Sequence, residues 1–155
     1  MYATRVSRRV RAPRAAVYRA LLDPAAVALW RVPDGMAAVV HSFDAREDGA
    51  FRVSLSYDDP HGTGKSGPHT DTYHGRFTRL VPDELIVETI EFETDEEALR
   101  GPMTLTTSLT EEDGVTEVVM FHKGIPDVVP REDNELGTRM ALDKLVRLVE
   151  GRERR

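Results

Sequence analysis

Six stretches of alternating or β-branched residues follow one another between residues 37 and 123, and each is bounded by a turn signal. Alternation of apolar and polar residues is typical of strands that bury one face. Asp113-Gly114 is a strong hairpin signal, and the connections are short enough for a meander. With a further stretch near the N-terminus, we predict an antiparallel sheet made of residues 3–10, 37–45, 50–58, 71–80, 85–94, 102–110 and 115–123.

Helical spacing appears on both sides of this strand region. Pro13 suits the first turn of a helix that continues to about residue 22, and Asp23-Pro24 can end that helix and cap a short second one at 25–30. Residues 131–150 carry acidic side chains near their start and basic ones near their end, which suits a helix dipole. We predict that this long helix lies on the sheet through Leu136, Met140, Leu142, Leu145, Leu148 and Val149.

The composition excludes several classes of protein. The chain contains no cysteine, so disulfide scaffolds, thiol nucleophiles, iron–sulfur clusters and thiolate zinc sites are absent. A net charge of -6 opposes binding to nucleic acid. No run of about eighteen apolar residues could span a membrane, and the first residues lack the apolar core of a secretory signal. We therefore expect a cytoplasmic protein with neither a nucleic-acid nor a membrane partner.

The length of 155 residues suits one domain with its own core. No linker is long enough to divide the chain, so we expect a single domain at residues 1–150 and a charged tail at residues 151–155. The sequence does not fix the oligomeric state, and a homodimer stays open.

Four runs of residues resemble the START-like helix-grip proteins of the SRPBCC superfamily. They are RAPRAAVYRAL at 11–21 followed by Asp23-Pro24, the single tryptophan Trp30, DAREDGAFR at 44–52 and GRFTRLVP at 75–82. Two later runs, GVTEVVMFHKGI at 114–125 and GTRMALDKL at 137–145, are similar to proteins related to the activator of the heat-shock-protein-90 ATPase. Thr138 stands where those proteins usually have tryptophan, and Ala50 replaces a hairpin glycine.

This resemblance implies an α+β helix-grip fold. A curved antiparallel sheet of about seven strands carries two short helices after the first strand, and the long C-terminal helix packs over its concave face. The resemblance also implies a hydrophobic cavity between sheet and helix, although fold alone does not define function. We expect the cavity to be lined by Trp30, His41, Phe43, Val53, Leu55, Tyr57, Tyr73, Phe77, Glu88, Ile90, Phe92, Met103, Met120, His122, Thr138, Met140 and Leu142.

Three functions fit such a protein. The first is binding of a small hydrophobic or amphipathic molecule without a metal or an organic cofactor. The second is an enzyme of the polyketide cyclase or hydrolase type, in which His41, Glu88 or His122 transfers protons. The third is an interaction module resembling the chaperone activator, with a chaperone or another protein as partner. Trp30 can either gate the cavity or fill the core beneath the second helix.

The segment at residues 58–71 is rich in glycine, proline, histidine and aspartate. Residues 62–66 resemble the end of a phosphate-binding loop, but position 59 is aspartate where that motif has its first glycine, and no helical pattern follows. Its histidines and aspartates, with His74, lack a metal-ligand spacing, so we expect no metal. We interpret the segment as a polar hairpin loop that could also act as a lid.

Overall fold

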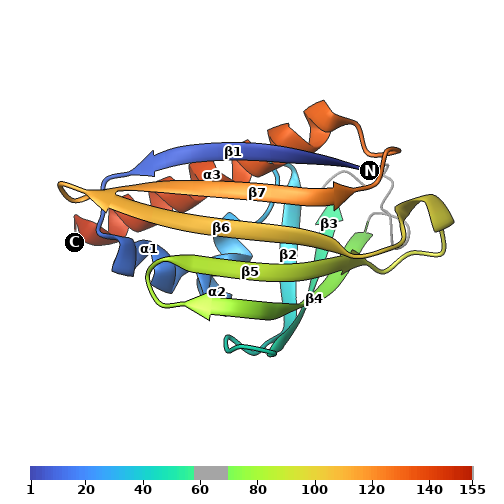
Figure 1. Ribbon diagram of the computed structural model, residues 1–155, viewed down its shortest axis with the longest axis horizontal. Helices are drawn as coiled ribbons and strands as arrows, with labels where there is room; N and C mark the ends of the chain where they lie inside the picture. Colours follow the sequence, from blue (N-terminus) through green and yellow to red (C-terminus); the bar gives the residue numbers. More distant parts are fainter. Residues whose placement is uncertain (58–69, 155) are drawn as a thin grey trace.

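The computed structural model describes residues 1–57 and 70–154, and it consists of one sheet with three helices on one side (Figure 1). The elements follow the order β1 (Tyr2–Val10), α1 (Arg14–Leu21), α2 (Pro24–Trp30), β2 (Met36–Phe43), β3 (Ala50–Tyr57), β4 (Thr70–Val81), β5 (Leu85–Phe92), the 3₁₀ turn η1 (Glu97–Leu99), β6 (Met103–Glu112), β7 (Val115–Ile125) and α3 (Arg131–Glu153). This is the predicted α+β helix-grip fold.

The sheet has the strand order β1-β7-β6-β5-β4-β3-β2, and all neighbouring pairs are antiparallel. The strands from β2 to β7 form the expected meander, and β1 closes the other edge beside β7. In Figure 1, β2 and β3 run across the direction of β5, β6 and β7, so the sheet curls strongly. The long helix α3 packs along β1, and α2 contacts both α3 and β2.

Local sequence explains the two short helices. Pro13 is the residue before α1, and its backbone carbonyl accepts the first hydrogen bonds of the helix. Asp23 caps α2 as predicted, because its carboxylate accepts a hydrogen bond from the Ala25 amide at 3.0 Å. Trp30, the last residue of α2, is almost fully buried, and its indole Nε1 donates to the carbonyl of Ala20 at 3.0 Å.

Four aromatic side chains anchor the curled part of the sheet. The rings of Phe43, Phe51, Phe77 and Tyr73 form a cluster with centroid separations of 5.0–6.3 Å. Phe51 packs directly over Gly75 on the neighbouring strand, where a side chain would collide with its ring. Position 75 therefore requires glycine, because the Phe51 ring leaves no room for a β-carbon there.

The C-terminal helix is longer than predicted. We expected it to end near residue 150 and to leave a charged tail, but α3 continues through Glu153. Gly151 has open space around the position of a β-carbon, so packing imposes no end on the helix there. The charged residues of the last turn are exposed, which a solvent-facing helix tolerates.

Candidate functional site

A cavity of about 270 Å³ lies between the concave face of the sheet and α3. Side chains from β3 to β7 form its floor, α3 forms one wall, and the segment after α2 forms another. Most of the surface is apolar. The lining residues are Trp30, Arg31, Val32, Pro33, Leu55, Tyr73, Ile90, Phe92, Met103, Leu105, Met120, His122, Val129, Asp133, Asn134, Gly137, Thr138 and Ala141.

A second pocket of about 640 Å³ adjoins this cavity and shares seven of its lining residues: Pro33, Leu55, Tyr73, Phe92, Val129, Asp133 and Gly137. Its described rim includes Val128 and Leu136, which are 57% and 46% exposed. We call the first the inner cavity and the second the outer pocket. Because they share walls, the outer pocket lies directly beside the inner cavity.

The structure divides the predicted cavity residues into three groups. The first group lines the inner cavity: Trp30, Leu55, Tyr73, Ile90, Phe92, Met103, Met120, His122 and Thr138. Tyr57 and Met140 line only the outer pocket. The third group faces the interior but lines neither space: Phe43, Val53, Phe77, Glu88 and Leu142.

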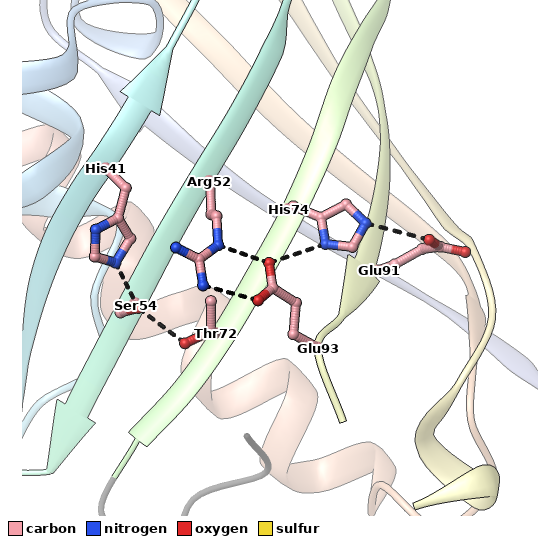
Figure 2. Close-up of polar contacts among 7 residues, drawn as sticks. All are labelled: His41, Arg52, Ser54, Thr72, His74, Glu91 and Glu93. Carbon is pink, nitrogen blue, oxygen red and sulfur yellow. Dashed lines mark hydrogen bonds and ion pairs between the residues drawn. The ribbon is translucent and has the colours of Figure 1, made fainter. Parts of the chain in front are cut away.

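His41 lies on the opposite face of the sheet, contrary to the prediction. A bulge between Val40 and Ser42 inserts one residue into β2, so His41 leaves the face that Val40 and Phe43 share. Its Nε2 lies 2.7 Å from the hydroxyl of Ser54 (Figure 2). His41 is exposed there and lines neither pocket.

The same outer face carries a group of charged side chains that span β3, β4 and β5 (Figure 2). Arg52 forms two hydrogen bonds of 2.9 Å with Glu93. His74 contacts Glu93 through Nδ1 at 3.1 Å and Glu91 through Nε2 at 3.4 Å. Because the two carboxylates lie on opposite sides of the ring, His74 acts as a bridge on the surface and not as part of the cavity.

An ion pair is buried beside the inner cavity. Arg31, the residue after α2, donates from Nη1 to Oε1 of Glu88 on β5 at 2.7 Å, and the two side chains are only 16% and 4% exposed. Burial alone would lower the pKa of Arg31, but the charge of Glu88 and the hydrogen bond to it raise the pKa above its usual value. The guanidinium also lies 5.5 Å from the ring centroid of Tyr73 and 5.8 Å from that of Phe51.

Arg31 lines the inner cavity and was not among the predicted residues. Arg31 follows Trp30, which was predicted to line the cavity. The sequence signal that could have indicated Arg31 is a charged residue between the apolar residues Trp30 and Val32. Its partner Glu88 is 57 positions away in the chain. Local periodicity carries no information on such a contact.

Two polar atoms in the cavity wall are buried and have no hydrogen-bond partner among the described residues. They are the hydroxyl oxygen of Tyr73 and Nε2 of His122. Burial raises the pKa of Tyr73, and the charge of Arg31 offsets part of that rise. The Tyr73 hydroxyl is therefore neutral and able to donate a hydrogen bond.

A short chain of hydrogen bonds holds His122. The Thr4 hydroxyl donates to Oδ1 of Asn134 at 2.7 Å, and Nδ2 of Asn134 lies 3.3 Å from Nδ1 of His122. With the amide in this orientation, Nδ1 accepts and the proton of neutral His122 is on Nε2. Burial, with a smaller contribution from the charge of Arg31, lowers the pKa of His122 to about 4. His122 is therefore neutral at pH 7.

This shift makes stability depend on pH. In the unfolded chain His122 takes up a proton as the pH falls through about 6.5, whereas in the folded chain it does so only near 4. The unfolded state therefore binds more protons between these values, and stability falls as the pH falls. We expect urea denaturation to show that wild type loses about 2 kcal/mol more than His122→Phe between pH 7 and pH 4.5. Parallel pH profiles for the two proteins would contradict this assignment.

The three catalytic candidates do not form a cluster in the described residues. His41 is on the other face, and the Glu88 carboxylate is bound to Arg31. Glu88 and His122 lie in one cross-strand row with Leu105 between them. Two strand spacings separate their backbones by roughly 10 Å. Glu88 and His122 are therefore too far apart to exchange a proton directly.

The predictions for residues 58–69 lie outside the described residues, including the phosphate-loop, lid and loop-histidine hypotheses. Within residues 1–57 and 70–154, no three His, Asp or Glu side chains come together in a way that could hold a metal ion. Across the same ranges, none of the helices is both long and apolar enough to span a membrane.

A curled antiparallel sheet that holds a long C-terminal helix over an apolar cavity defines the helix-grip class of SRPBCC-type proteins. The chain matches the family described as "Activator of Hsp90 ATPase homolog 1-like protein" over residues 11–150. It belongs to that family. This agrees with the resemblance in residues 114–125 and 137–145. No curated protein matches the sequence.

Solved structures share the fold over nearly the whole chain. Protein CV1439 from Chromobacterium violaceum is 34% identical, with a TM-score of 0.85 and 96% of each chain covered. A protein from Rhodobacter sphaeroides is 19% identical, with a TM-score of 0.79, and the match covers 97% of this chain and 93% of that one. DynU16, described as a putative protein in the dynemicin biosynthetic locus, is 18% identical with a TM-score of 0.66. The match covers 96% of this chain but 47% of DynU16.

Proposed function

We propose that this protein binds a small, mostly apolar molecule in the inner cavity. The observation that carries the proposal is a space of about 270 Å³ lined mostly by apolar side chains from the sheet and α3. That volume lies just below the range of about 300–1,000 Å³ that is usual for ligand pockets. It suits a molecule of one or two rings, and the outer pocket adjoins it.

Filling the cavity tests this proposal. Ala141 is buried on α3 and lines the inner cavity, so Ala141→Leu adds three carbon atoms to the space that a ligand would occupy. We expect equilibrium dialysis with 2-acetylnaphthalene to show at least tenfold weaker binding to this variant than to wild type. Ala25→Leu, at an exposed position of α2, is the matched control and should bind like wild type. Equal affinity of all three proteins would contradict binding in the cavity.

A chaperone partner is a second candidate, and the family match over residues 11–150 is the observation that favours it. The family description names the Hsp90 ATPase, but no partner of this chain follows from that name. An Hsp90 ATPase assay with and without the protein tests this candidate. The cyclase or hydrolase alternative ranks lower, because Glu88 is held by Arg31 and His41 lies on the outer face.

A further inference from the structure

The polar groups of the inner cavity restrict the chemistry of its ligand. The Tyr73 hydroxyl and His122 Nε2 both belong to side chains that line the cavity, and neither has a hydrogen-bond partner among the described residues. A buried polar group without a partner is costly, so such groups are rare outside functional sites. Two such polar groups in one cavity wall indicate that a molecule bound in the cavity supplies their hydrogen-bond partner.

Both groups act as donors. The contact of Asn134 with Nδ1 leaves the proton of His122 on Nε2. The Tyr73 hydroxyl can donate as well, and Arg31, whose guanidinium lies beside the Tyr73 ring, has only donors. A ligand group that satisfies this site must therefore be an acceptor.

The described cavity wall offers no unpaired positive charge to hold an anion. The positive charge of Arg31 is matched by Glu88 at 2.7 Å, and the other charged wall residue, Asp133, is acidic. A carboxylate brought into this apolar space would lose its hydration without gaining a free counter-charge, which is costly. A neutral acceptor such as a carbonyl oxygen avoids that cost.

Water is a poorer partner than a ligand here. A buried water usually makes about three hydrogen bonds, whereas the surrounding wall consists mainly of apolar side chains such as Leu55, Ile90 and Met120. Neighbouring side chains cover the two polar atoms in this structure. An incoming oxygen therefore reaches them by side-chain rotation, which is common when partners bind.

Building on the proposed binding function, we infer that the ligand is a neutral carbonyl compound, such as an aromatic ketone. Its oxygen accepts a hydrogen bond from the Tyr73 hydroxyl, with His122 Nε2 as a second donor in the same cavity wall, and its apolar body fills the cavity. Arg31 is a positioning residue. Its guanidinium lies 5.5 Å from the centroid of the Tyr73 ring and holds that ring in place.

Two probes of the same shape test the inference. 2-Acetylnaphthalene has a carbonyl group, and 2-isopropenylnaphthalene has a methylene group in place of the oxygen. We expect equilibrium dialysis to show that wild type binds the ketone about tenfold more tightly than the alkene. Tyr73→Phe removes only a hydroxyl group that has no partner among the described residues, so it should fold and should lose most of this preference while binding the alkene unchanged. His122→Phe should act in the same direction.

Tyr18→Phe is the matched control, because Tyr18 lies on α1 and lines neither pocket; it should keep the full preference for the ketone. Equal binding of both probes to wild type would overturn the carbonyl inference and leave cavity binding intact. A preference that survives both Tyr73→Phe and His122→Phe would also overturn it. If wild type binds neither probe, the proposed function fails and the inference fails with it.

Discussion

Glu88→Leu is expected to lower the free energy of unfolding by about 3–5 kcal/mol. The substitution leaves the guanidinium of Arg31, which is only 16% exposed, without the carboxylate that now lies 2.7 Å away. Bringing a charge out of water is favourable only when a partner compensates for the lost hydration. Urea denaturation of wild type and variant at pH 7 measures this cost.

The control for this prediction is the double variant Arg31→Met/Glu88→Leu. Replacing both charged groups with apolar ones removes the unpaired charge, so the double variant should be more stable than Glu88→Leu alone. A loss of less than about 1 kcal/mol in Glu88→Leu would show that the ion pair is not important for the fold. A double variant no more stable than that single one would contradict a cost that comes from the unpaired charge of Arg31.

Gly75→Ala is expected to destabilise the protein by about 3 kcal/mol. A β-carbon at this position would lie 2.2 Å from the backbone oxygen of Thr89 and 2.6 Å from Cζ of Phe51. The first contact is with the main chain of β5, so rotating the Phe51 side chain cannot relieve it. Thermal unfolding followed by circular dichroism should show a midpoint about 6–12 °C lower than that of wild type.

Gly151→Ala is the matched control for that substitution. Gly151 lies in α3, and a β-carbon added there would have no neighbouring atom within 4 Å. Alanine favours a helix over glycine by about 0.5–1 kcal/mol, so this variant should be slightly more stable than wild type. Equal midpoints for Gly75→Ala and Gly151→Ala would contradict the close approach of the Thr89 backbone and the Phe51 ring to Gly75.

The architecture could be predicted because its signals are local. Alternation with period two predicted the strands. Asp23-Pro24 predicted the start of α2, and Asp113-Gly114 predicted the turn between β6 and β7, and the structure has both at these positions. Asp113 and Gly114 both have positive φ angles, of 53° and 77°, as a tight hairpin turn requires.

The site could be predicted only in part, because its decisive features are not local. The bulge in β2 puts His41 and Phe43 on opposite faces, and a shift of one residue leaves no clear mark in an alternating sequence. The partner of Arg31 is 57 positions away, and the partner of His122 lies 12 positions further on in α3, so no spacing rule indicates either contact. Apolar wall residues such as Met103 and Met120 were accessible to prediction, because strand alternation and turn positions together assign their face.

Methionine methyl groups offer the most direct test of binding in the inner cavity. The chain has five methionines. Met103 and Met120 line the inner cavity, Met36 and Met140 line the outer pocket, and Met1 lines neither. In a protein labelled with ¹³C at its methionine methyl groups, titration with 2-acetylnaphthalene should shift the signals of Met103 and Met120, saturate at one molecule per chain and leave Met1 unchanged. Unchanged signals of Met103 and Met120 at the highest concentration of 2-acetylnaphthalene would contradict binding in the inner cavity.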